Sequence, residues 1–400
     1  MRHFSLVKTR TRALGALAAA MAAVTVLGTA GPASASLSSS DWTKVPLPSG
    51  YFISRQTAVA ADSCVRGTQF CMVMASNSAD VRNGNPNAIA DGVLVTTDGG
   101  QTWTGYNTLP AAFYRGLSLS CWSASVCGVA GQDIFGETQV AFTTDGGQTW
   151  TDPTPASWAN VNWIATSMDC VSASTCWLTG LNGPFGNLVE PILMKTPDLG
   201  ATWQDHSNNL PDSHSTNPNI SYSLQDISCV SAASCVAVGG PNQVGGKGTV
   251  LVTNDGGQSW IRFPSAKLDN FQSVSCVPGF VLPTCFATGS VYDAQLGADD
   301  SVTAASLTGG RFWNVDQNLG NQGQPFFSMT CTDASHCWAG GNGGTEALDG
   351  TADGGTSWSL VTSSDDGTDL GDVACLSVNL CVATTDNGLW LTTDDGGLAG

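Results

Sequence analysis

Carboxylates are the side chains in this sequence with the widest capacity for chemistry. Asp and Glu number 32 against 14 Lys and Arg, and the formal net charge is −18. Cleavage of a glycosidic bond needs, in most enzymes, two carboxylates about 5–10 Å apart. The acids that we expect on the face formed by the long, variable loops, the loop face, are Asp133, Glu137, Glu190, Asp226, Asp269, Asp293, Asp299, Asp300 and Asp369. We retain Glu137, Glu190, Asp269 and Asp369 as candidate catalytic residues, although the sequence alone does not pair them.

The first 35 residues have the pattern of a secretory signal peptide. Four basic residues, Arg2, Lys8, Arg10 and Arg12, precede an apolar stretch from Ala13 to Ala30, and Ala33-Ser34-Ala35 follows as a cleavage site. We therefore expect a secreted, extracellular protein consisting of residues 36–400, with no membrane anchor. The strong acidity argues against nucleic acid and anionic membrane surfaces as partners, because both require basic patches.

Fourteen cysteines fall into seven close pairs. An exported chain with an even number of cysteines is expected to form disulfides, and short spacing favours pairing across hairpin turns. Metal binding by these thiols is the alternative, but the spacings vary and histidine is scarce, so we expect no metal and no cofactor. The expected bridges are Cys64–Cys71, Cys121–Cys127, Cys170–Cys176, Cys229–Cys235, Cys276–Cys285, Cys331–Cys337 and Cys375–Cys381.

A second repeat alternates with the cysteine pairs. The octapeptide TTDGGQTW occurs at Thr96–Trp103 and again at Thr143–Trp150, and weaker copies follow. Glycine supplies positive φ for a tight turn, the Asp carboxylate accepts backbone N–H bonds within it, and the Trp packs between sheets. We therefore expect a structural role for the Asp/Trp pairs Asp98/Trp103, Asp145/Trp150, Asp198/Trp203, Asp255/Trp260 and Asp353/Trp358.

Together the two repeats define a unit of four short strands that recurs about every 45–60 residues. Such a period without helices favours a β-propeller. Seven cysteine pairs predict an all-β, single seven-bladed propeller of four-stranded blades with one hairpin disulfide per blade. The last unit stops at Thr392–Gly397 without its Trp, whereas Asp41–Pro46 looks like the strand that follows a box elsewhere. The N-terminal strand is therefore expected to complete the last blade and close the ring.

The pattern S/T-x-D-x-G-x-T/S-W resembles the Asp-box, or BNR repeat, of sialidase-like and photosystem-assembly-factor-like β-propellers. The resemblance implies that the box is structural and lies away from the active face. Two units depart from it, with Thr308 in place of the Asp and Leu199 in place of the first Gly. The Arg-Ile-Pro motif of sialidases is absent, since Arg55 is followed by Gln56 and Thr57. A true sialidase is therefore not expected.

The loops opposite the cysteine turns are long and irregular, and such loops on a rigid scaffold commonly carry function. Seven residues before the first Cys of three pairs stand Tyr114, Trp163 and Tyr222, and Arg115 follows Tyr114. These residues form a candidate ligand-binding arc, because aromatic rings stack on the apolar faces of sugars. The alternative is that the aromatics pack between blades or plug the central channel.

Three functions remain open from the sequence. The first is a secreted, monomeric propeller that recognises a ligand, foremost a glycan, through the loop face. The second is a glycoside hydrolase or lyase that uses carboxylates on that face. The third is a scaffold or assembly factor that binds an extracellular protein.

Overall fold

The computed structural model describes residues 42–53, 62–77, 92–110, 113, 115–133, 135–159, 161, 163–183, 190–215, 217, 220–241, 246–265, 268–293, 298–316, 326–341, 347–362, 370–385 and 388–392. The expected signal peptide, residues 1–35, lies outside these ranges. No helix among the described residues is long and apolar enough to cross a membrane.

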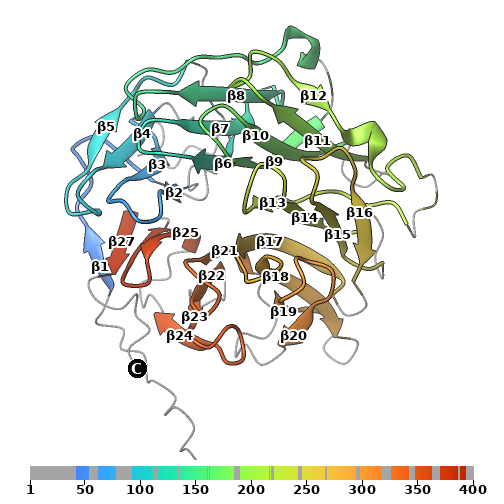
Figure 1. Cartoon of the computed structure of the whole chain (residues 1–400). Helices are drawn as coiled ribbons and strands as arrows, with labels where there is room; N and C mark the ends of the chain where they lie inside the picture. Colours follow the sequence, from blue (N-terminus) through green and yellow to red (C-terminus); the bar gives the residue numbers. More distant parts are fainter. Residues whose placement is uncertain are drawn as a thin grey trace, which may run out of the picture. The chain divides into compact units, whose positions relative to one another are not determined.

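Seven antiparallel sheets stand around a common centre (Figure 1). Blade one contains β2 (Asp62–Cys64), β3 (Cys71–Ala75), β4 (Gly92–Thr96) and β5 (Thr104–Tyr106). Blade two contains β6 (Arg115–Cys121), β7 (Cys127–Gln132) and β8 (Thr138–Thr143). Blade three contains β9 (Trp163–Cys170), β10 (Cys176–Asn182), β11 (Glu190–Thr196) and β12 (Gln204–Asp205). Two short 3₁₀ helices, η3 (Ala156–Trp158) and η4 (Ser207–Asn209), follow β8 and β12.

Blades four to six have the same order from the centre outwards. Blade four contains β13 (Asp226–Cys229), β14 (Cys235–Gly239), β15 (Thr249–Thr253) and β16 (Ile261–Pro264). Blade five contains β17 (Asn270–Val277), β18 (Thr284–Asp293), β19 (Ala298–Ser306) and β20 (Asn314–Asp316). Blade six contains β21 (Phe326–Cys331), β22 (Cys337–Gly341), β23 (Ala347–Thr351) and β24 (Ser359–Thr362).

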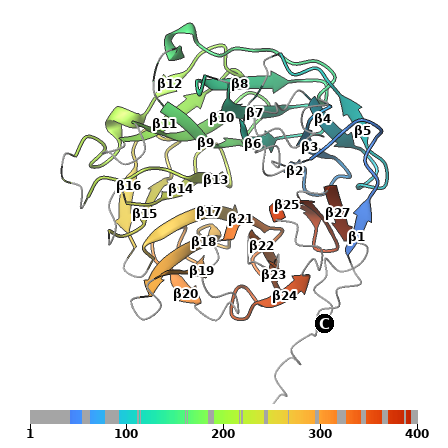
Figure 2. The same cartoon turned by 180° about the vertical axis from the view of Figure 1, so that it is seen from behind.

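The seventh blade joins the two ends of the described chain. It contains β25 (Leu370–Ser377), β26 (Leu380–Thr385) and β27 (Gly388–Thr392), and β1 (Trp42–Val45) pairs with β27 as its outermost strand. Figure 2 shows the same neighbours from behind. The predicted seven-bladed ring and its closure by the N-terminal strand are confirmed. This closure pairs the outer edge of β27 with β1, so that edge is not left open.

All seven predicted disulfides are present, one in each blade, and each joins the two innermost strands across their turn. Their Cα–Cα distances are 3.9–4.1 Å because paired cysteines face each other in the strand register, as Cys176 and Cys170 do. The bridges therefore stabilise the inner hairpin of every blade.

The turn built by the repeated octapeptide is a network of side-chain bonds. In blade two, Thr143 Oγ1 donates to Asp145 Oδ1 at 2.8 Å and accepts the N–H of Gly147 at 2.9 Å. Asp145 also accepts the N–H and the hydroxyl of Thr149 at 2.8 and 2.6 Å, and Trp150 Nε1 donates to the Gly147 carbonyl. Equivalent carboxylate contacts surround Asp98, Asp198, Asp255 and Asp353. These contacts support a structural role for the acids.

The box tryptophans differ in how deeply they pack. Trp103 and Trp260 are buried, as expected for rings that lie between sheets. Trp150, Trp203 and Trp358 are half-buried, and each packs, as expected, against a core cluster that two neighbouring blades share.

The half-buried rings still contact the core that their blade shares with the preceding blade. Trp203 of blade three lies 5.1 Å from Trp158 and 6.4 Å from Phe142, ring centre to ring centre. Its Nε1 has no hydrogen-bond partner in the described part of the chain. Trp358 of blade six packs at the edge of a cluster that includes Phe286 of blade five. These tryptophans therefore cover the rim of the core and do not fill its centre.

The two departing turns form by different means. Thr308 Oγ1 takes the place of the carboxylate and accepts the N–H of Phe312 at 2.9 Å. Leu199 adopts the positive φ of 53° that glycine has in the other boxes, a conformation that costs a non-glycine residue about 1–2 kcal/mol. Both sheets nevertheless form, as expected.

In blades one to six, the described box turns are bonded to the cysteine hairpin of their own blade. The N–H of Gly146 donates to the Ser125 carbonyl, and that of Gly256 to the Ala233 carbonyl, at 2.9 and 3.0 Å. The two sets of turns therefore lie on one face of the ring, which we call the disulfide face. The opposite face carries the connections between blades and is called the loop face.

The core lies between neighbouring blades. Phe142 of blade two packs with Trp163 and Leu178 of blade three, and Trp177 meets Trp260 edge-on at 5.6 Å. Because every sheet buries both of its faces, β3, β7, β14 and β22 are buried along their whole length.

Candidate functional site

The aromatic residues expected on the loop face are buried. Trp163 is 4 % exposed and packs edge-on against Trp158 at 4.8 Å. Tyr222 is 0 % exposed, its hydroxyl donates to the Pro211 carbonyl, and the Arg262 guanidinium covers its ring at 4.2 Å. The packing alternative therefore describes both residues, and neither presents a ring to a ligand. Burial of this kind depends on how blades meet, which the spacing within one repeat does not reveal.

The other members of the expected arc are not placed. Tyr114 lies outside the described residues, and Arg115 opens β6 with its side chain outside them as well. The candidate catalytic residue Asp369 also lies outside the described residues. Their assignment stays a prediction.

Two of the candidate catalytic acids have side-chain partners among the described residues. Glu190 Oε1 lies 3.2 Å from His214 Nδ1, and Asp269 bonds Lys247 Nζ and accepts the N–H of Tyr292. Glu137 joins a local turn through its backbone N–H, which donates to Asp133 Oδ1 at 2.9 Å. The contacts among the described residues bring no two of Glu137, Glu190 and Asp269 together as a catalytic pair.

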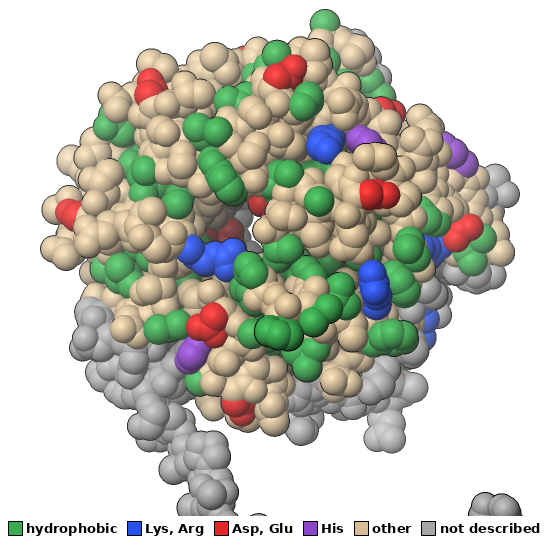
Figure 3. Space-filling model, in the orientation of Figure 1, with side chains coloured by type: hydrophobic (Ala, Val, Ile, Leu, Met, Phe, Trp, Pro, Cys, Tyr) green, Lys and Arg blue, Asp and Glu red, His purple; other side chains and the backbone are tan. Residues whose placement is uncertain are grey.

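A cavity of about 1000 Å³ occupies the centre of the ring. It is lined by the innermost strand of every blade and, at its mouth, by hairpin residues of the disulfide face that include Arg66, Trp122 and Pro278. Figure 3 shows this hollow, with acidic colour visible inside it and a basic side chain at its edge. We call it the central channel.

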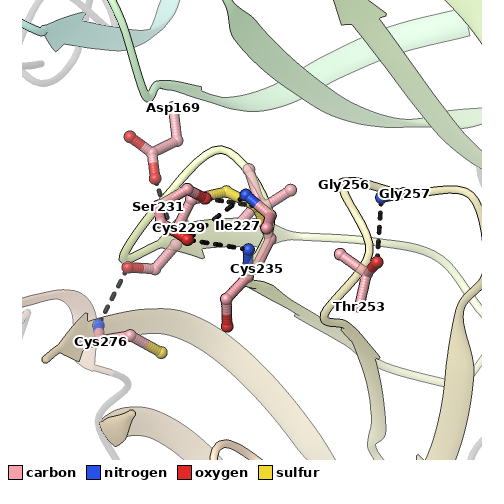
Figure 4. Close-up of a disulfide and its surroundings, with 12 residues drawn as sticks. Asp169, Ile227, Cys229, Ser231, Cys235, Thr253, Gly256, Gly257 and Cys276 are labelled. Atoms are coloured by element: carbon pink, nitrogen blue, oxygen red, sulfur yellow. Dashed lines mark hydrogen bonds between the residues drawn. A yellow bond between two sulfur atoms is a disulfide. The ribbon is translucent and has the colours of Figure 1, made fainter. Parts of the chain in front are cut away.

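The channel wall carries polar side chains at two levels. The residue before the first Cys of a pair accepts the N–H of the corresponding Cys in the next blade, at 2.6–3.1 Å across five successive blade junctions. These acceptors are Ser63, Ser120, Asp169, Ser228 and Ser275. Figure 4 shows the Asp169 carboxylate directed at Cys229. The innermost strand has no backbone partner on its inner edge, so side chains satisfy its exposed N–H groups.

The second level lies two residues earlier in each strand, on the same side of the sheet. Ser118 accepts the N–H of Met168, Asp226 that of Val274 and Asp372 that of Asp62, at 2.9, 2.7 and 3.3 Å. The sequence placed Asp226 on the loop face, and that placement is wrong: it lines the channel. The signal that would have located it is the pattern polar-x-polar-Cys, as in SLSC, SMDC, DISC and SVSC.

Four aspartates give the channel its electrostatic character, and burial is the main cause of their raised pKa values. It raises the pKa of Asp169 to about 7 and that of Asp372 to about 6. It also raises the pKa of Asp226, and the pKa of Asp62 is raised by burial and then by the nearby charge of Asp372. Charged carboxylates are therefore costly in this channel unless something compensates them.

Arg66 is the one basic side chain among the described residues that line the channel. Its Nη1 donates to the Cys331 carbonyl at 2.8 Å, and its charge lowers the pKa of Asp169 against the larger effect of burial. The described residues contain no group of three His, Cys, Asp or Glu arranged to hold a metal ion. The site is thus a hydroxyl- and carboxylate-lined channel with one basic residue near its mouth.

Comparison with known proteins shows the fold and no family. A scan against models of protein families found no match, and a search of curated protein sequences also found none. Among solved structures, YCF48 from Cyanidioschyzon merolae is similar, with a TM-score of 0.57 and 15 % identity over 88 % of this chain and 98 % of that one.

Two carbohydrate-active proteins are similar to a comparable extent. The GH74 xyloglucanase from Xanthomonas campestris has a TM-score of 0.55 and 13 % identity, over 88 % of this chain and 53 % of the enzyme. An ulvan lyase of polysaccharide lyase family PL25 has a TM-score of 0.53 and 11 % identity, over 88 % and 94 %. The molecule is a seven-bladed β-propeller of a kind that known proteins use for different tasks.

Proposed function

We propose that this chain is an extracellular binding propeller that takes a glycan into its central channel from the disulfide face. One observation carries the proposal: the channel is a polar cavity of about 1000 Å³ with an exposed aromatic ring at its mouth. The location differs from the loop face expected from sequence, because Trp163 and Tyr222 are buried.

The chemistry of the wall suits a sugar. Ser63, Ser228 and Ser275 each accept a backbone N–H, and a hydroxyl that accepts one bond keeps its proton to donate. The buried carboxylates supply acceptors for sugar hydroxyls. Trp122 lines the mouth and is 47 % exposed, so its ring is free to stack on the apolar face of a pyranose.

The comparisons support this proposal only at the level of the scaffold. A xyloglucanase and a polysaccharide lyase are built on similar propellers, so the fold is compatible with carbohydrate ligands. The disulfides support extracellular use, because such bonds persist in oxidising compartments.

A glycan array on the purified protein tests the proposal. The protein is compared with Trp122→Ala and with Phe135→Ala, which removes an exposed ring from the loop between β7 and β8. Binding that is lost in Trp122→Ala and kept in Phe135→Ala supports a channel ligand. Equal binding by all three, or none by the native protein, overturns it. Release of reducing ends would instead establish a glycoside hydrolase, with the channel aspartates as its first candidates.

A different observation favours a protein ligand as the second candidate. Blade five exposes Phe280 and Val281 in its long cysteine hairpin and Leu307 and Phe312 in its departing box turn. The two turns are bonded through the Gly309 N–H and the Pro283 carbonyl, so these apolar side chains belong to one surface. Peptides selected from a displayed random library, and then retested on Phe280→Ser/Phe312→Ser, would identify such a ligand by loss of binding in the variant.

A further inference from the structure

Arg66, at the mouth of the central channel, forms no ion pair with any of the described acids. The chain has 32 acidic residues against 14 Lys and Arg, yet the ion pairs in the described part of the chain do not include Arg66. A guanidinium has five N–H donors, and the described residues occupy one of them, through the bond to the Cys331 carbonyl. Arg66 is exposed and lines the channel. Its unused donors are therefore accessible where a ligand would enter.

An exposed aromatic ring lies on the hairpin next to that of Arg66. The Cys121 N–H of blade two donates to Ser63 Oγ of blade one at 3.0 Å, so the two hairpins run side by side around the mouth. Trp122 directly follows Cys121, lines the same mouth and is 47 % exposed. The mouth thus combines a ring on which a pyranose can stack with a positive charge.

The channel wall behind Arg66 loses its negative charge in mild acid. Burial raises the pKa of Asp169 to about 7 and that of Asp372 to about 6, and it raises the pKa of Asp226 as well. Below about pH 6 the carboxyl groups of Asp169 and Asp372 are therefore mostly neutral, whereas a guanidinium stays charged. Under these conditions the mouth holds a positive charge with little negative charge to oppose it.

From these features we propose that the glycan is acidic and that Arg66 binds its oxyanion, which is a carboxylate or a sulfate ester. The inference rests on the proposed function and specifies the class of its ligand. Two parallel N–H groups of a guanidinium match two oxygens of an oxyanion. The bond to the Cys331 carbonyl holds the side chain across the mouth before a ligand arrives, which lowers the cost of ordering it on binding.

The overall charge of the chain restricts what this site can bind. The net charge of −18 repels polyanions, although the repulsion is largely screened beyond about 8 Å at physiological ionic strength. Nucleic acids and anionic membranes require a basic patch, whereas one oxyanion on a short glycan requires a single cation. We therefore expect a short acidic oligosaccharide to bind and a long polyanion to be disfavoured.

Matched pairs of oligosaccharides provide the test. A galacturonate trimer is compared with its methyl ester, and a sulfated galactose trimer with the desulfated sugar, so each pair differs only in the oxyanion. In one pair, calorimetry at pH 5.5 should show the acidic member binding at least about ten-fold more tightly, because charge-assisted hydrogen bonds are about twice as strong as neutral ones. Arg66→Gln should lose this preference and Arg66→Lys should keep part of it. Arg311→Gln removes the same charge outside the channel and should keep all of it.

The pH dependence gives a second readout that needs no change at Arg66. Asp226 and Arg66 are the charged groups that act on Asp169, and Asp372 acts on Asp62 further round the channel. Between pH 5.5 and pH 8 Asp372 and then Asp169 ionise, so the preference for the acidic member should decrease. Asp169→Asn stays neutral throughout and should retain more of the preference at pH 8.

Each other outcome has a defined meaning. If neutral and acidic members of both pairs bind equally, or if the glycan array yields only neutral ligands, the inference fails and the proposed function stands. A preference that persists in Arg66→Gln overturns the assignment to Arg66. If polyglutamate binds and no glycan does, the glycan proposal fails as well. If Arg66→Gln does not fold, the pH series decides, because a preference that is constant from pH 5.5 to pH 8 in the native protein overturns the inference.

Discussion

Arg66 of blade one donates from Nη1 to the backbone carbonyl of Cys331 in blade six, at 2.8 Å. The two residues are 265 positions apart in the chain, and the inner strand of blade seven lies between theirs. The next residue, Gly67, donates its N–H to the Leu376 carbonyl of blade seven at 3.1 Å. The hairpin of blade one therefore bonds to blade seven at the disulfide face. It contacts the innermost strand of blade seven, β25, whereas β1 pairs with β27 at the outer edge of the same sheet.

Replacement of Arg66 by Ala should destabilise the ring. The variant loses a charged hydrogen bond, and such bonds contribute about 1.5–3 kcal/mol to folding. Because Arg66 also lowers the pKa of Asp169, the loss should be larger at pH 8 than at pH 5. Urea denaturation at both pH values measures this. Lys44→Ala, on the exposed face of β1, serves as the control, and equal urea midpoints for the two variants would contradict the assignment.

Stability should fall as the pH rises from about 4 to 7. The folded-state pKa values of Asp169 and Asp372 are about 7 and about 6, above the ordinary 3.8, so the folded protein holds protons that the unfolded chain has already released. In that window the unfolding free energy decreases with pH and then levels off. Thermal melts from pH 4 to 8 should show the decline, and Asp169→Asn should flatten it. A melting temperature that rises over this range would refute the expectation.

The aspartates of the box turns should have the opposite effect at low pH, where stability should decrease as the pH falls. Hydrogen bonds to the carboxylate lower the pKa of Asp255 to about 2, first from the Ser259 hydroxyl and then from its N–H. The stability that this carboxylate contributes is therefore present above pH 4 and lost as the pH falls through about 2. Unfolding by acid, followed by tryptophan fluorescence, should shift to higher pH in Asp255→Asn, and an unchanged acid midpoint would count against it.

A substitution in the box turn of blade five should increase the stability of the fold. Thr308→Asp should restore the carboxylate acceptor for the Phe312 N–H and the Ser306 hydroxyl. Each such bond contributes about 0.5–1.5 kcal/mol. Asp145→Thr in blade two makes the reverse change and should lose a similar amount. Melting temperatures that move in the same direction for both substitutions would show that the carboxylate is not the cause.

Removal of one bridge should have a measurable but local effect. In the chain-entropy picture, a loop as short as that between Cys121 and Cys127 contributes roughly 2–3 kcal/mol. The double variant Cys121→Ser/Cys127→Ser should lower the unfolding free energy by that amount and leave the circular dichroism spectrum unchanged. Loss of the β spectrum would instead mean that each bridge is required for the fold.

The ring could be predicted from sequence because its determinants are local and repeated. A cysteine pair sets a hairpin, and TTDGGQTW sets a turn, so counting seven pairs gives seven blades. The site could not be predicted in the same way. Trp163 and Asp226 differ in burial only because of what the neighbouring blade presents. Asp62 stands in the stretch ADSC, at a position where the other six strand ends have Leu, Met, Ile or Val. Its missing partner is visible only after blades one and seven meet.

How deeply each box tryptophan is buried could not be predicted from the sequence, for the same reason. Trp103 and Trp358 close boxes of nearly the same wording, yet the first ring is buried and the second is half-buried. The box sets the turn, whereas the contacts of the ring depend on side chains that another blade supplies.

The spacing of the disulfides also bears on how the chain is made. Eight cysteines alone allow on the order of a hundred pairings, yet here the partners are six to nine positions apart. Loops of this length close in about 10–100 ns, long before the next hairpin has been synthesised. Oxidation can therefore proceed in the order in which hairpins emerge, and an isomerase has little to correct.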